Sequence, residues 1–194
     1  GFSYQDRIRA GVVAAKDHIM DKLSRLAAEG RPVLGICNGA QVLVESGFIP
    51  GIHWERVDLA LAPNVMADRE GYYCDWIFLR REDSPCVWTG SYEREEVIPV
   101  PIAHAEGRFV TGDPGILDDM RKNGQIALRY CTSRGGGDKS FPVNPNGSVD
   151  NIAGVCNPGG NVLAMMPHPE RASWLRQVPE DLPGAWGRRR KMAS

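Results

Sequence analysis

The chain has 194 residues and a hydrophobic content of 42%, which suits one well-buried globular domain. Its formal net charge of -1 gives no basic field for nucleic acid, and no apolar run approaches the roughly 20 residues of a membrane span. Five cysteines without a CxxC pair argue against a disulfide framework or a zinc site. We therefore expect one cytoplasmic domain over residues 1–194 that binds no metal, nucleic acid or membrane.

The first part of the chain alternates between predicted helices and a strand. Apolar residues recur at three- and four-residue steps over residues 4–28 and predict an amphipathic helix that ends at Gly30. The apolar run Val33–Ile36 predicts a strand buried on both faces, and a second helix is expected at Asn38–Glu45. A helix, a buried strand and another helix in close order indicate an α/β fold.

The rest of the chain is richer in predicted strands. A short helix is expected at Pro114–Lys122. Two apolar runs, residues 152–155 and 162–166, flank Pro158-Gly159-Gly160 and predict a β-hairpin. The other strand candidates are residues 73–79, 97–103 and 125–130.

Cys37 lies where the predicted strand meets the second helix, in the stretch VLGICNGAQVL. Gly35 and Gly39 are two residues away on either side, so G-x-C-x-G has the spacing of the nucleophile elbow of α/β hydrolases. The elbow exposes its side chain at the carboxyl end of the strand, and the amino end of the next helix favours a thiolate. A lone cysteine is more often a core residue, but the two glycines favour a nucleophile.

A cysteine nucleophile needs a base, and His168 in MMPHPER is the strongest candidate among the four histidines. Pro167 and Pro169 keep this segment out of a helix, and residues two apart in an extended chain point the same way. Glu170 is therefore expected beside the His168 ring, where a carboxylate can fix the tautomer. With Cys37 these residues predict a Cys-His-Glu triad.

Together, GICNGAQ and PHPE resemble the class I, or triad-type, glutamine amidotransferases. PIAHAEGRF and AMMPHPER are most similar to the glutaminase subunits of phosphoribosylformylglycinamidine synthase, and the similar stretches span residues 1–171. The resemblance implies a flavodoxin-like α/β fold with a mostly parallel sheet flanked by helices. It also implies that the family's N-terminal strand–helix unit, which precedes Gly1, is missing from this sequence.

The resemblance implies a chemistry for the predicted triad. Cys37 attacks the side-chain amide of glutamine. His168, oriented by Glu170, acts first as general base and then protonates the departing ammonia. Water then hydrolyses the γ-glutamyl thioester and releases glutamate.

The resemblance also implies four residues around the substrate. The backbone N–H groups of Asn38 and Gly1 form the oxyanion hole, and Gln41 helps to hold glutamine. His104, in PIAHAEGRF, lies near the glutamine site. A purely structural role for His104, as a loop histidine that holds a turn, is equally open.

The partners implied by the resemblance are a large synthetase subunit and a small accessory subunit. The chain has no ATP motif, because residues 133–140 lack the G-x-x-x-x-G-K-[ST] pattern. No cofactor is therefore expected in this chain, and ATP and Mg²⁺ belong to the synthetase. Two alternatives remain open: a triad glutaminase of another synthase or a related cysteine hydrolase of the same fold, and a catalytically impaired binding subunit.

Overall fold

The computed structural model describes residues 19–53, 56–68 and 70–193. The helix predicted over residues 4–28 is confirmed in its described part, α2 (Ile19–Ala28). The earlier part of that helix and the oxyanion-hole candidate Gly1 lie outside the described residues. In the part of the chain that is described, no helix is long and apolar enough to cross a membrane.

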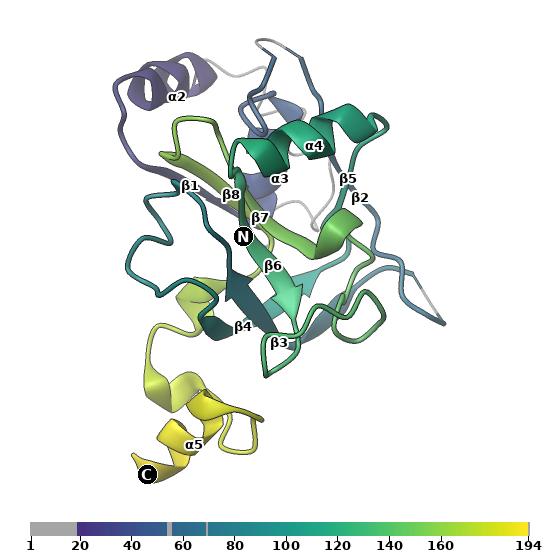
Figure 1. Cartoon of the computed structure of the whole chain (residues 1–194), viewed down its shortest axis with the longest axis vertical. Helices are drawn as coiled ribbons and strands as arrows, with labels where there is room; N and C mark the ends of the chain where they lie inside the picture. The colour runs from purple at the N-terminus through teal and green to yellow at the C-terminus, as the bar shows by residue number, and fades with distance from the viewer. Residues whose placement is uncertain (1–18, 54–55, 69, 194) are drawn as a thin grey trace.

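Six strands form the central sheet in the order β1-β8-β7-β6-β3-β4 (Figure 1). Every strand predicted from the sequence is present. A separate antiparallel pair, β2 (Ala60–Ala62) with β5 (Arg108–Val110), was not predicted. The strands of the central sheet are β1 (Val33–Ile36), β3 (Tyr73–Arg81), β4 (Val97–His104), β6 (Ile126–Cys131), β7 (Ile152–Cys156) and β8 (Val162–Met165).

The central sheet is mixed rather than mostly parallel. β1 and β8 are parallel, with Ile36 opposite Met165. The other four neighbouring pairs are antiparallel. One cause is the predicted hairpin, which is confirmed: residues 157–161 join β7 to β8, and so short a connection reverses the chain. The expectation of a mostly parallel sheet is corrected in this respect, whereas the α/β class is confirmed.

Two helices cover one face of the sheet. α3 (Asn38–Glu45) and α4 (Pro114–Lys122) have the bounds predicted from the sequence, and both pack against β7 and β8 in one hydrophobic core. The amino end of α4 is stabilised by an N-cap, because the Asp113 side chain accepts a hydrogen bond from the Gly115 N–H (2.8 Å). Because α3 begins directly after β1 in the chain, its amino end lies at the carboxyl end of that strand.

The opposite face of the sheet curls around a second core. This core holds Leu163 and Met165 of β8 together with Val100 and Ile102 of β4. Because three strands separate β8 from β4 in the sheet, their side chains can share a core only if the sheet curls strongly. The curl brings β4, at one edge of the sheet, back towards the carboxyl ends of β1 and β8.

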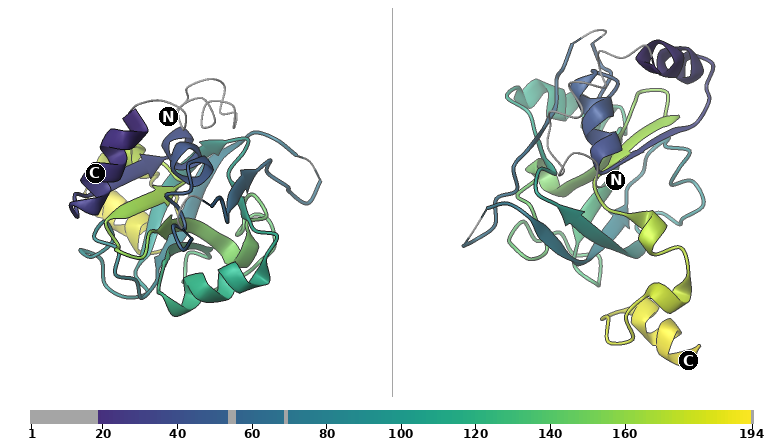
Figure 2. Two further views of the ribbon diagram at one scale, coloured as in Figure 1. Left: turned by 90° about the horizontal axis from the view of Figure 1, so that it is seen from above. Right: turned by 180° about the vertical axis from the view of Figure 1, so that it is seen from behind.

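Loop and tail contacts tie this curled sheet together. In the loop between β3 and β4, Trp88 Nε1 donates to the Val33 carbonyl of β1 (3.0 Å). The unpredicted helix α5 (Ala185–Met192) stands away from the sheet in Figures 1 and 2. It is anchored by Trp186, whose Nε1 donates to the Val97 carbonyl of β4 (3.0 Å). β4 is therefore held in place by the C-terminal segment as well as by β3.

Gly35 of β1 lies so close to α3 that a Cβ at this position would clash with the helix. A Cβ at this position would lie 2.6 Å from the Gly39 carbonyl oxygen and 2.5 Å from Leu43 Cδ1. Gly35→Ala is therefore expected to lower the free energy of unfolding by about 2 kcal/mol in denaturant titrations. Gly39→Ala is the matched control, since a Cβ there meets no described atom within 4 Å outside its own helix. Equal losses in the two variants would contradict the steric explanation.

Candidate active site

Cys37 forms the elbow between β1 and α3 that the sequence predicted. Its φ of 51° and ψ of -108° lie in a region that non-glycine residues rarely adopt, at a cost of roughly 1–3 kcal/mol. The Cys37 N–H donates to the Met165 carbonyl of β8 (2.9 Å), and its carbonyl accepts from the Gln41 N–H (3.1 Å). These two bonds hold the strained residue between strand and helix. Only Gly35, of the two flanking glycines, is needed for close packing.

His168 follows β8 as Cys37 follows β1. Because the two strands are parallel neighbours with Ile36 opposite Met165, both residues leave the sheet at the same edge. His168 is buried, and its backbone N–H donates to the Pro101 carbonyl of β4 (2.8 Å). The predicted nucleophile and the predicted base are therefore brought together from sequence positions far apart.

Glu170 fixes the orientation of the His168 ring. The His168 Nδ1–H donates to Glu170 Oε1 (2.6 Å), so Nε2 carries the lone pair of a base. His168 Nε2 is buried and has no hydrogen-bond partner among the described residues. The predicted pair is present, but the expected extended segment is wrong. Pro169–Arg171 is a 3₁₀ turn, and this turn folds Glu170 back towards the ring.

The end of β4 forms a third wall of the site. The Ala103 carbonyl oxygen lies 4.0 Å from Cys37 Sγ, two residues beyond the Pro101 carbonyl that binds His168. Alternate carbonyls of a strand point to the same edge. One edge of β4 therefore contacts both the cysteine and the histidine. Nothing in the sequence signals this, because it depends on the curl of the whole sheet.

Asn38 and Gln41 are linked by their side chains at the start of α3. Asn38 Nδ2 donates to Gln41 Oε1 (2.9 Å), and Gln41 Nε2 donates to the Glu106 carbonyl (2.9 Å). Gln41 thus joins α3 to the loop after β4, and its contact with substrate stays a prediction. The Asn38 N–H belongs to the first turn of α3, where amides have no acceptor within the helix, as an oxyanion donor requires.

His104, at the end of β4, is fully buried. Its Nδ1 lies 3.2 Å from Asn64 Oδ1, and Asn64 was not singled out from the sequence. Burial, with a smaller contribution from the charge of His168, lowers the pKa of His104 to about 3. His104 is therefore neutral at physiological pH and does not act as a cation.

All five cysteines are free thiols in the structure, and Cys74 is the exposed one. Residues 133–140, which were rejected as a phosphate loop, form a turn after β6 that is not followed by a helix.

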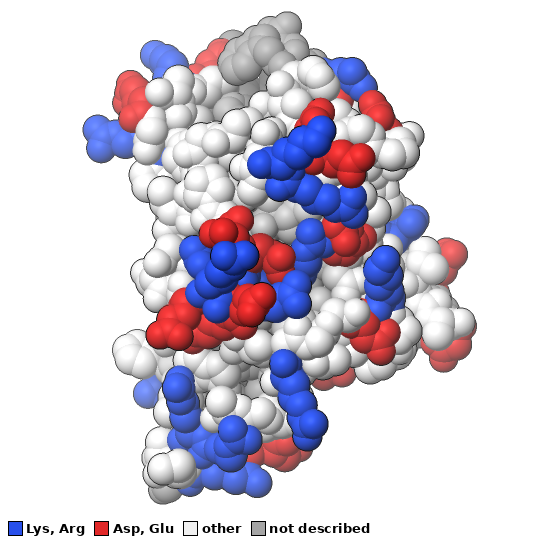
Figure 3. Space-filling model, in the orientation of Figure 1, with Lys and Arg blue, Asp and Glu red and all other residues white. Residues whose placement is uncertain are grey.

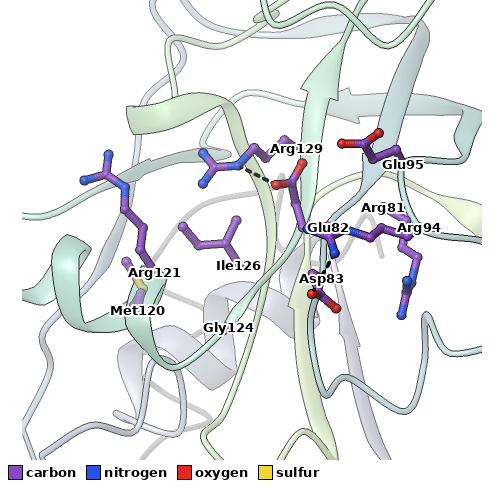
Figure 4. Close-up of a pocket in the computed structure, with 10 residues that line it drawn as sticks. All are labelled: Arg81, Glu82, Asp83, Arg94, Glu95, Met120, Arg121, Gly124, Ile126 and Arg129. Carbon is purple, nitrogen blue, oxygen red and sulfur yellow. Dashed lines mark ion pairs between the residues drawn. The ribbon is translucent and has the colours of Figure 1, made fainter.

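A charged cleft of about 160 Å³ lies elsewhere on the molecule (Figure 4). Its opposite charges pair with one another: Arg129 contacts Glu82 (3.4 Å), and Arg94 contacts Asp83 (3.2 Å). The surface view shows acidic and basic side chains intermixed across this face (Figure 3). None of the residues lining the cleft belongs to the candidate triad. Cys37 therefore stays the candidate nucleophile.

A cysteine at a strand-to-helix elbow and an oriented histidine after the neighbouring parallel strand form the arrangement that a cysteine-dependent hydrolase or amidotransferase requires. The CobB/CobQ-like glutamine amidotransferase domain matches residues 1–192, and the chain belongs to this family. The resemblance to triad-type glutamine amidotransferases inferred from the sequence is thereby confirmed.

Individual relatives agree with the family. The phosphoribosylformylglycinamidine synthase subunit PurQ of Methanothrix thermoacetophila is 50% identical over 190 residues, which are 94% of this chain and 72% of the relative. The same subunit of Methanocaldococcus jannaschii is 46% identical over 173 residues, which are 89% of this chain and 69% of the relative. The structure of PurLQS from Thermotoga maritima matches 100% of this chain and 74% of that chain, with a TM-score of 0.66 and 35% identity.

The charge of Glu170, at the His168–Glu170 hydrogen bond, is expected to support catalysis. Glu170→Gln keeps an oxygen that can accept from Nδ1 but removes the charge that stabilises the imidazolium, so kcat for glutamine hydrolysis should fall by about 10²-fold or more. The measurement is steady-state release of glutamate. Glu29→Gln is the control, because Glu29 is an exposed acid before β1, at the other end of that strand. A Glu170→Gln variant as active as this control would remove Glu170 from the triad.

Proposed function

We propose that this chain is the glutaminase subunit of a phosphoribosylformylglycinamidine synthase, and that it hydrolyses glutamine to glutamate and ammonia. The observation that most supports this is the placement of Cys37 and His168 at the ends of adjacent parallel strands. The 50% identity to a PurQ subunit supports the choice of synthase.

The first half of the reaction forms a thioester. His168 Nε2 takes the thiol proton, and Cys37 Sγ attacks the side-chain carbonyl carbon of glutamine. The Asn38 N–H donates to the resulting oxyanion, and Gly1 is the candidate for the second donor. The imidazolium then passes its proton to the leaving nitrogen. The C–N bond breaks, ammonia departs, and the γ-glutamyl thioester remains on Cys37.

The second half restores the enzyme. His168 Nε2 takes a proton from water, and the water oxygen attacks the thioester carbonyl. The C–S bond then breaks, glutamate leaves, and the proton returns from the imidazolium to the Cys37 thiolate. Glu170 accepts the Nδ1–H in every step, so the same tautomer is available for both half-reactions. Gln41 and His104 belong to the glutamine pocket in this proposal.

The ammonia is used by a partner. The solved PurLQS assembly contains a chain 35% identical to this one, which supports a complex with a synthetase subunit and a small accessory subunit. In this proposal the synthetase aminates formylglycinamide ribonucleotide with ATP and Mg²⁺, and this chain carries no cofactor of its own. The free thiols of the chain suit a reducing cytoplasm.

Removal of the nucleophile tests this function. Cys37→Ser, assayed in complex with the synthetase, should abolish glutamine-dependent synthesis and leave ammonia-dependent synthesis intact, because only glutamine hydrolysis uses the thiol. A glutamine analogue bearing a diazoketone should label Cys37 in the unmodified protein, as detected by peptide mass spectrometry.

Cys74→Ser is the matched control, since Cys74 is the exposed thiol and should be neither labelled nor required. Absence of label at Cys37 in the partner-bound protein would refute the enzymatic function. Failure of the phosphoribosylformylglycinamidine synthetase subunit to stimulate an otherwise active glutaminase would favour a different synthase.

A further inference from the structure

Asn64, which follows β2, holds the loop that begins at His104. Asn64 Nδ2 donates to the His104 carbonyl (2.7 Å) and to the Gly71 carbonyl (3.0 Å). Asn64 Oδ1 accepts from the Gly107 N–H (3.0 Å) and faces His104 Nδ1 at 3.2 Å. One buried amide therefore binds both the backbone and the ring of His104.

This arrangement fixes the tautomer of His104. Both hydrogens of the Asn64 amide are directed at carbonyl oxygens, so the amide cannot be flipped and Oδ1 can only accept. His104 Nδ1 must then carry the proton, and Nε2 carries a lone pair. His104 Nε2 is buried and has no hydrogen-bond partner in the described part of the chain. The structure thus presents an unused acceptor.

The ring of His104 is clamped next to the triad. A Cβ at Gly107 would lie 2.5 Å from both Nδ1 and Cε1 of the ring, so the glycine lets the loop lie against it. On the other side of the residue, the adjacent Ala103 carbonyl is the one 4.0 Å from Cys37 Sγ, and His168 is close enough for its charge to act on the His104 ring. The unused acceptor therefore belongs to a residue that neighbours both the candidate nucleophile and the candidate base.

We propose that Asn64 is a positioning residue that keeps His104 Nε2 as an acceptor for the carboxamide N–H of bound glutamine. This inference rests on the proposed glutaminase function. It also gives the site a means of selection, because a carboxylate offers no hydrogen and would set its own lone pairs against Nε2. Glutamine is therefore preferred over its product, glutamate, and the product is released once the amide has been hydrolysed.

Asn64→Asp tests the inference. The carboxylate can keep Nδ1 as a donor but stabilises the protonated ring, so the pKa of His104 rises and Nε2 becomes a donor once the pH falls below the raised value. Glutamine binding should weaken by roughly tenfold as the pH is lowered through that value, while glutamate binding does not. Both dissociation constants are measured by calorimetry on the Cys37→Ser protein in complex with its synthetase, so that no turnover occurs. ¹⁵N NMR of histidine-labelled protein should show the Nδ1–H tautomer at His104 before the change.

Asn161→Asp is the matched control. Asn161 Nδ2 likewise donates to two backbone carbonyls, those of Ala27 (2.8 Å) and Arg31 (3.0 Å), but Asn161 lies before β8, at the end away from the site. The control should match Asn64→Asp in any loss of stability and keep the preference for glutamine. An unchanged ratio of the two dissociation constants in Asn64→Asp would overturn the proposal.

His104 itself supplies a second pair of variants if Asn64→Asp does not fold. His104→Gln can place an amide oxygen near the position of Nε2 and should keep the preference for glutamine, whereas His104→Leu should lose it. Equal preferences in these two variants would also overturn the proposal. The proposed function fails separately, if the wild-type complex neither binds nor hydrolyses glutamine while His104 still shows the Nδ1–H tautomer.

Discussion

The parallel register between β1 and β8 is the constraint on which the candidate site depends. Residue 36 lies opposite residue 165, and the Cys37 N–H continues the ladder by donating to the Met165 carbonyl. A slip of one residue would turn the side chains of β8 to the opposite face and move them between the two cores. All four residues of β8 are buried, with alternate residues packed in different cores, so this packing holds the register, and the register sets the candidate nucleophile beside the candidate base.

The antiparallel part of the sheet allows the sheet to curl. Since β7, β6, β3 and β4 follow β8 in antiparallel pairs, the sheet can curl until its last strand returns to its first. The return brings the Pro101 and Ala103 carbonyls to His168 and Cys37. A flat sheet with the same register would keep the triad but lose this wall. The mixed character that the sequence did not predict is thus part of how the site is built.

A feature of this fold could be predicted from the sequence when the residues that determine it lie within one short stretch of the chain. The elbow at Cys37 and the pair His168–Glu170 are contained in short stretches of the sequence, so residue type and spacing were enough to predict them, although the pair lies in a 3₁₀ turn and not in the expected extended segment. Asn64 acts on His104 across 40 positions, through a short strand pair with no sequence signal. The β4 wall likewise depends on the curl of the whole sheet. The order of strands is a global property, and hydrophobic periodicity, which is local, does not report it.

Several local costs of this fold lie at the candidate site. Cys37 has a strained backbone, and both His104 Nε2 and His168 Nε2 are buried without a partner among the described residues, which costs roughly 1–3 kcal/mol for each unsatisfied atom. In contrast, the buried side-chain amide of Gln125 donates to two backbone carbonyls. A core selected only for stability would not leave two ring nitrogens unpaired next to a strained cysteine. The unpaired atoms are therefore best explained by a ligand that brings the missing hydrogens. His168 needs a thiol or water proton, and His104 needs an N–H, which glutamine carries and glutamate's side chain lacks.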